Sequence, residues 1–280
     1  MKKHITTVLL ILVLLIGLSL VLYPSISNWW NETRSSKVIS DYNELVAELD
    51  EDDYEQMWND AIAYNANRAQ PINPYLLTPE QKQTYHSVLN LDGNGVMGYI
   101  EIPSIGVSLP MYHTVNEDIL QVAAGHVEWS DLPVGGENTH CVLSGHRGLP
   151  SAKLFTDLDD LRVGDIFMLR VLDTLLTYEV DQILIVDPGD VKNLRRVSGQ
   201  DLCTLVTCTP YGINTHRLLV RGHRIENTPE TAVIRVTANA VQVDSMIVAL
   251  IAAVPMMAVA VTGLLFTSNR RSRKNNRRRR

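Results

Sequence analysis

The stretch TLVTCTPYGINTHRLLVRGHR, residues Thr204 to Arg224, holds two apolar, β-branched runs separated by a turn-forming segment. The first run ends on Cys208, and the second begins nine positions later at Arg217. Runs of this kind, divided by Pro, Gly and Asn, are typical of neighbouring β-strands. The pattern predicts a strand that ends on a thiol and a second strand that returns past it with a guanidinium.

The same pattern of short apolar runs and turn residues extends from Gly93 to about Asn227. Short β-rich runs alternate there with Gly, Pro, Asn and Asp, which indicates a β-barrel or sandwich with little helix except around Ser151–Leu161. The runs are GYIEIPSIGVSLPMY, HCVLSGH, DIFMLRV, LLTYEVDQILIV, CTLVTC and HRLLVRGHRI.

A second polar residue, His146, ends the run HCVLSGH. In an alternating strand it shares a face with Ser144, just as Cys208 shares one with Val206. If the two strands are neighbours, imidazole and thiol lie side by side, where a thiolate nucleophile would have a proton donor beside it. Arg217 could then steady a developing oxyanion. The alternatives are a buried, unreactive cysteine and a structural histidine.

Three cysteines, Cys141, Cys203 and Cys208, are too few for a disulfide framework and leave at least one free thiol. The chain has no Cys-x-x-Cys or His-x-x-x-His spacing, so the sequence gives no support for a zinc site.

Both ends of the chain are apolar. Residues 5–23 and 246–266 are free of charged side chains, and each run approaches the ~20 residues that cross a bilayer as a helix. A cleaved signal peptide is the alternative for the first run, but no Ala-x-Ala site follows it. A buried core helix is the alternative for the second. We expect two membrane-spanning helices.

Charge predicts the orientation of these spans. Lys2 and Lys3 precede the first span, eight basic residues lie between Arg270 and Arg280, and basic flanks stay in the cytoplasm. Both termini are therefore expected inside and residues 24–244 outside. Without those ten cations the chain has 15 Lys and Arg against 31 Asp and Glu, a balance of −16 that argues against nucleic-acid binding. The tail can also touch anionic lipid.

The segment from residue 24 to 92 is expected to be helical and then loop-like. Two amphipathic stripes, one from Val38 to Leu49 and one from Tyr54 to Ala61, are divided by the acidic run Asp50–Asp53. They predict two helices that pack on the main domain. The run QPINPYLLTPE, residues 70–80, holds three prolines and is predicted to be a loop.

Three stretches, GYIEIPSIGVSLPMYH, SDLPVGGENTHCVLSGHRGLP and TLVTCTPYGINTHRLLVRGHR, resemble the sortase family of Gram-positive bacteria. The likeness covers about residues 95–225. Together with the second apolar run, it is nearest to the class C, pilin-polymerising sortases.

The resemblance implies a mainly β fold, an eight-stranded sortase β-barrel with an N-terminal helical segment and a transmembrane helix at each end. It assigns Cys208 as nucleophile, His146 as general acid/base and Arg217 as oxyanion and substrate stabiliser. The implied enzyme is a cysteine transpeptidase that cleaves an LPxTG-like sorting signal after Thr and holds a thioacyl intermediate. A lysine amine of the next pilin subunit resolves that intermediate. Implied partners are pilin subunits and the bilayer, with no metal or organic cofactor.

The implied domain organisation follows. It comprises a cytoplasmic N-terminus (1–4), a span (5–23), a helical juxtamembrane segment with a candidate lid loop (24–92), the catalytic barrel (93–228), a stalk (229–244), a second span (245–267) and a basic cytoplasmic tail (268–280).

Several class C enzymes have a lid loop with an Asp-Pro-aromatic motif before the barrel. Asn73-Pro74-Tyr75 stands in that region here, with the acidic member absent. If this loop is a lid, Asn73 bonds Arg217 more weakly than a carboxylate would, and Tyr75 covers Cys208. The alternative is an ordinary Pro-rich connector.

In sortase barrels the strands that bear the catalytic His and Cys are parallel neighbours. Cys141 and Cys203 each precede a site residue by five positions, so the resemblance places them at similar depth on the opposite face. We expect two buried thiols there, since facing positions on parallel strands rarely have good bridge geometry, and a disulfide is the alternative. Asp131 and Asp157 are both candidates to orient His146. The remaining histidines at 113, 126, 140, 216 and 223 are expected to be structural.

Rival functions are a sortase that attaches proteins to the cell wall, a secreted cysteine hydrolase, and a membrane-anchored scaffold without catalysis. A scaffold has no use for a thiol at a strand end, which disfavours the last.

Overall fold

The computed structural model describes residues 2–68 and 77–229. Two units make up the chain, Ile26–Ala238 and a second one of Met1–Ser25 with Asn239–Arg280. The candidate lid residues Asn73, Pro74 and Tyr75 lie outside the described residues. So do the predicted second span, the basic tail and nearly all of the stalk.

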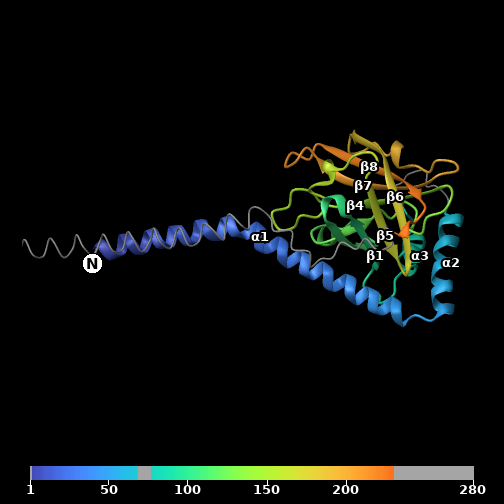
Figure 1. Cartoon of the computed structure of the whole chain (residues 1–280), viewed down its shortest axis with the longest axis horizontal. Coiled ribbons are helices and arrows are strands. Elements are labelled where there is room, and N and C mark those ends of the chain that lie inside the picture. The colour runs from blue at the N-terminus through green and yellow to red at the C-terminus, as the bar shows by residue number, and fades with distance from the viewer. Residues whose placement is uncertain (1, 69–76, 230–280) are drawn as a thin grey trace, which may run out of the picture. The chain divides into compact units, whose positions relative to one another are not determined.

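Eight strands form a closed barrel in the order β1-β2-β3-β4-β7-β8-β6-β5, which confirms the predicted eight-stranded fold (Figure 1). Pairs β2–β3 and β4–β7 are parallel, and the other neighbours are antiparallel. The strands are β1 (Val96–Ile102), β2 (Val107–Tyr112), β3 (Ala124–His126), β4 (Thr139–Ser144), β5 (Ile166–Val171), β6 (Thr174–Val186), β7 (Asp201–Thr209) and β8 (His216–Ile225). The sequence pattern missed β3, which is too short to show a period.

The barrel wall alternates between two apolar faces. Cys141 of β4, Cys203 of β7 and Val220 of β8 belong to the large interior core. Their neighbours Val142 and Leu219 belong to a smaller cluster on the outer face. Because successive side chains point to opposite faces of a strand, Cys208 lies on the outer face with Val206 and Thr204.

Three helices precede the barrel: α1 (Lys2–Glu48), α2 (Glu51–Asn67) and α3 (Pro79–Ser87). Both predicted stripes pack on the barrel, with Tyr42 of α1 and Ala61 of α2 buried. Asp50 caps α2 by accepting a 2.8 Å bond from the Asp53 N–H. Figure 1 shows α2 and α3 beside one another along the barrel wall.

Helix boundaries differ from expectation at three places. Helix α1 continues through Pro24, where a boundary was expected. Helix α3 begins inside the expected loop, because Thr78 and Gln81 form a reciprocal capping box around Pro79. The prediction of a helix around Ser151–Leu161 is wrong. That segment holds turns and one 3₁₀ turn, η2 (Leu158–Asp160), and Leu154 adopts a left-handed φ of 43°.

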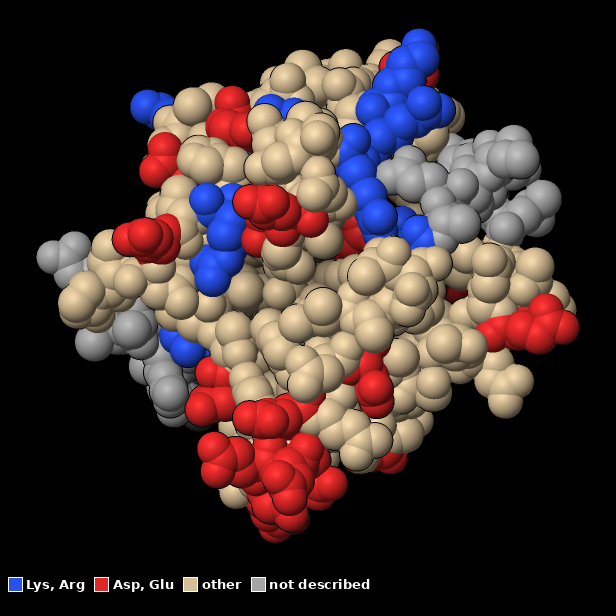
Figure 2. Space-filling model, turned by 90° about the vertical axis from the view of Figure 1, so that its right-hand side faces the viewer, with Lys and Arg blue, Asp and Glu red and all other residues tan. Residues whose placement is uncertain are grey.

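Among the described residues, one helix is long and apolar enough to span a membrane, the part of α1 from Leu10 onward. Its length and position suit either a membrane anchor or a signal sequence. Acidic side chains are concentrated at one end of the face in Figure 2, where α1 and α2 meet and the run Asp50–Asp53 lies.

Candidate active site

Strands β4 and β7 bring His146 and Cys208 together. They pair in parallel from Thr139↔Asp201 to Ser144↔Val206. Beyond the end of β4 the pairing continues, because Gly145 N–H donates to Val206 O at 3.1 Å and Thr207 Oγ1 donates to Gly145 O at 2.8 Å. His146 therefore lies level with Cys208, and the expected parallel neighbours are found.

Strand β8 adds the guanidinium. Cys208 and Arg217 are direct partners in the antiparallel β7–β8 ladder, so their side chains rise from the same face at neighbouring positions. Arg217 Nη1 donates to the carbonyls of Asn214, at 3.4 Å, and His216, at 3.1 Å. The turn thus holds one end of the guanidinium. All three predicted site residues are half-buried on one edge of the barrel.

The structure gives His146 a partner that the sequence did not suggest. Its Nε2 lies 3.2 Å from both carboxylate oxygens of Glu117, on the short helix α4 (Glu117–Leu120). The pKa of the Glu117 carboxyl is lowered, chiefly by a hydrogen bond from Gln121 and to a smaller extent by one from His146. The two aspartates expected as candidates are engaged elsewhere: Asp131 pairs with Arg196 and Asp157 with Lys153.

Tight loop packing explains the glycines around His146. A side chain at Gly145 would lie 2.6 Å from the Phe155 ring. Gly148 has a φ of +76° and closely faces the ring of Tyr211, which follows Cys208 in the chain. Arg147 pairs with Asp159 and lies 5.9 Å from the Tyr211 ring centroid, so the loops after β4 and β7 hold one another.

An apolar strip covers the outer face between the site and the loop before β7. Its buried members are Val142, Leu194 and Leu219, and Trp129 and Val206 pack against them. The strip lies on the same face as Cys208, which suits an extended ligand with apolar side chains.

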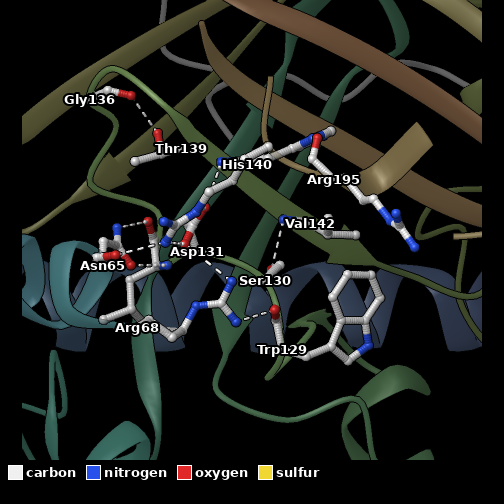
Figure 3. Close-up of polar contacts among 12 residues, drawn as sticks. Asn65, Arg68, Trp129, Ser130, Asp131, Gly136, Thr139, His140, Val142 and Arg195 are labelled. Atoms are coloured by element: carbon white, nitrogen blue, oxygen red, sulfur yellow. Dashed lines mark hydrogen bonds and ion pairs between the residues drawn. The ribbon is translucent and has the colours of Figure 1, made fainter. Parts of the chain in front are cut away.

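A buried polar network lies at the other end of β4 and β7 (Figure 3). Asp131 accepts bonds at 2.8 Å from His140 N–H and from Arg196 Nε, and it pairs with Arg68 at 3.3 Å. His140 Nε2 is 2.7 Å from the Thr204 hydroxyl and its Nδ1 is 2.8 Å from Arg195 O, which fits a neutral ring that donates through Nδ1. Burial lowers the pKa of His140.

The three thiols have different surroundings. Cys141 and Cys203 are direct partners in the ladder, both buried and both free, while Cys208 is half-buried and free. The expected pair of thiols at equal depth is therefore confirmed. Burial raises the pKa of Cys141 well above its usual range, so this thiol is an inert core residue.

A thiol, an imidazole and a guanidinium at one edge of a barrel are suited to cysteine-dependent acyl transfer. A family profile described as Sortase domain matches residues 100–225. Sortase C1 of Streptococcus agalactiae is 49% identical with a TM-score of 0.66, over 69% of this chain and 100% of that chain.

Two further similar proteins are also sortases. Sortase C of Streptococcus pneumoniae is 44% identical with a TM-score of 0.60, over 69% of this chain and 98% of that chain. Sortase A of Streptococcus agalactiae serotype III (strain NEM316) is 25% identical over 225 residues, 79% of this chain and 85% of the relative. The chain belongs to the sortase family, whose members are cysteine transpeptidases, and its structural neighbours are class C sortases.

Proposed function

We propose that this protein is a membrane-anchored transpeptidase that cleaves LPxTG-like sorting signals after Thr and joins pilin subunits through a lysine amine. The observation that carries the proposal is the register of β4, β7 and β8, in which Cys208 stands level with His146 and opposite Arg217. The likeness to class C sortases supports the pilus assignment, and sortase C of Streptococcus pneumoniae has a structure that bears on pilin substrate specificity.

In the first half-reaction, the Cys208 thiolate attacks the carbonyl carbon of the substrate Thr, and Arg217 stabilises the oxyanion. His146 in its protonated form gives its proton to the departing Gly amine as the C–N bond breaks. The product is a thioester between Cys208 and the first pilin.

In the second half-reaction, a lysine amine of the next pilin attacks the thioester carbonyl. His146, now neutral, takes the amine proton, and the C–S bond breaks to restore the thiolate. The apolar strip beside the site offers a surface for the apolar residues of the sorting signal.

The membrane arrangement belongs to the same proposal. We assign the apolar N-terminal helix as an anchor, residues 245–267 as a second span, both termini to the cytoplasm and the barrel to the outside. Charge at both chain ends supports it. Domain boundaries are proposed as the sequence indicates, with the catalytic unit at 93–228 and the stalk at 229–244.

Asn73, Pro74 and Tyr75 are proposed as a lid over Cys208, on the strength of their sequence and their place between α2 and α3. Deletion of residues 72–76 is expected to raise the rate of sorting-peptide cleavage. An unchanged rate would leave this segment an ordinary connector.

The proposal is tested with the full chain in detergent micelles, an LPxTG-type peptide and a candidate pilin. Intact mass should show a thioacyl adduct in wild type and none in Cys208→Ala, followed by a lysine-linked pilin ladder. No adduct with any sorting peptide, even after loop deletion, would refute the proposed chemistry.

A second candidate is a sortase that attaches proteins to the cell wall, favoured by the likeness to sortase A of Streptococcus agalactiae. An adduct that passes only to a cell-wall amine would select it. An adduct that passes only to water would select a hydrolase.

A further inference from the structure

We infer that Glu117 is the positioning residue of His146, and that carboxylate, imidazole and thiol act as one series across the site. The inference rests on the proposed function, because it concerns the rate only if His146 is the acid and base. Residues Glu117 and His146 are 29 positions apart, and no sequence motif joins them.

The contact between Glu117 and His146 fixes the orientation of the imidazole ring. Both Glu117 oxygens lie 3.2 Å from Nε2, so the Nε2–H points between them. With Nε2 engaged in this way, Nδ1 is the ring nitrogen left to exchange protons with the thiol and the substrate. A base fixed in one tautomer by a carboxylate is the arrangement that makes a nucleophile–base pair effective.

The short helix that carries Glu117 is held firmly at its base. Gly125 of β3 packs against the backbone of Thr114 so closely that no side chain would fit there. The Ala123 N–H donates to Ile119 O at 2.9 Å, and Ser35 of α1 donates to Val122 O at 3.5 Å. Gln121 Nε2 donates to Glu117 Oε1 at 3.3 Å and steadies the carboxylate itself.

The charged and polar groups near His146 determine what its contact with Glu117 does chemically. The Glu117 carboxylate from α4 contacts His146 directly, and the strand register brings Cys208 of β7 and Arg217 of β8 to the same edge of the barrel, while the adjacent Arg147 is turned toward Asp159. Because the Glu117 carboxylate accepts the ring N–H, it holds one nitrogen of the imidazole as a donor and leaves the other nitrogen to deliver a proton to the leaving amine.

We expect the Glu117–His146 pair to contribute little to the stability of the fold. Glu117 is 69% exposed, and ion pairs between exposed groups contribute little to folding. An orienting bond acts instead through the fraction of molecules in which the ring has the required tautomer and protonation state. Its loss should therefore change the turnover number and the pH profile, with little change in unfolding.

The test compares Glu117→Gln and Glu117→Asp in the full chain, with Asp118→Asn as the matched control, since Asp118 is the exposed acidic neighbour on the same turn. With a sorting peptide and a lysine acceptor, Glu117→Gln should lower kcat about tenfold and leave KM within about twofold. Glu117→Asp should recover part of the rate, and Asp118→Asn should match wild type.

A second readout needs no substrate. Diethyl pyrocarbonate modifies accessible imidazole nitrogens, so loss of the carboxylate that engages Nε2 should make His146 react severalfold faster in Glu117→Gln than in wild type, as measured by peptide mass mapping. Equal modification rates in both proteins would overturn the inference whatever the substrate. If wild type turns over, His146→Ala does not, and Glu117→Gln keeps the wild-type rate and profile, the proposed function stands and this inference fails.

Discussion

Strands β4 and β7 lie side by side, and their two ends have opposite character. At the end near Asp131, the buried carboxylate pairs with two arginines, and the buried His140 is held at both ring nitrogens. At the end near Cys208, the polar side chains are half-exposed and bonded to loop carbonyls or to a solvent-facing carboxylate.

The paired strands β4 and β7 therefore combine a rigid, buried end with a reactive, half-exposed end. Buried charges are tolerated only when paired, so the Asp131 end fixes the register of the two strands. The same register then sets the positions of His146 and Cys208 at the half-exposed end. Substitutions at the two ends should therefore separate stability from activity.

The largest difference between the two ends should appear in thiol reactivity. Cys208 should react with iodoacetamide at least ~10³-fold faster than Cys141 and Cys203, because the buried thiols become accessible only in the unfolded fraction. Peptide mass mapping over time measures each rate. Native protein should take up one label and urea-denatured protein three. Comparable labelling of Cys203 in native protein would contradict this account of the core.

At the open end, Arg217→Gln should lower kcat/KM by about 10²–10³, as expected for the loss of an oxyanion donor. The melting temperature should stay nearly constant, because the bonds that the guanidinium makes to described residues go to carbonyls of the turn before β8. Arg162→Gln, at an exposed arginine before β5, is the control and should retain wild-type kinetics. A fall of the same size in both variants would point to net charge instead.

At the buried end, Asp131→Asn should lower the free energy of unfolding by about 3 kcal/mol, because it leaves Arg68 and Arg196 without their carboxylate. Urea denaturation in detergent measures the loss, and the rate per folded molecule should fall much less. Asp159→Asn removes the exposed partner of Arg147 and should cost no more than about 1 kcal/mol. Equal costs would erase the distinction between the two ends.

The smallest effect should be acid destabilisation through buried histidines. Burial lowers the pKa of His113 and His140 below the usual 6.5, so the unfolded chain takes up protons first as the pH falls. Stability is unaffected by these groups above pH 6.5 and declines below it, until the folded pKa is reached. Melting temperatures at pH 7.5 and 5.5 should show this decline. His140→Gln should weaken the pH dependence.

Much of this architecture could be predicted from the sequence. Period-two runs and turn residues predicted a β-barrel or sandwich, and the resemblance selected the barrel and brought Cys208, His146 and Arg217 to one edge. Glu117 could not be found in that way, because its contact depends on how the β2–β3 crossover packs. Asp131 was misjudged for a related reason: its burial between two arginines arises from segments that are distant in sequence, and nothing beside it in the chain shows this.

The parallel β4–β7 pair also determines when the enzyme can become reactive. His146 and Cys208 are 62 positions apart, and all of β5 and β6, the loop before β7 and most of β7 must be made between them. A pairing of such long range forms late in folding, after local hairpins. As the chain is synthesised from its N-terminus, the half that carries Glu117 and His146 is complete before the nucleophile exists. Cys208 meets its imidazole only when the barrel closes, so an incomplete chain cannot acylate itself or its neighbours.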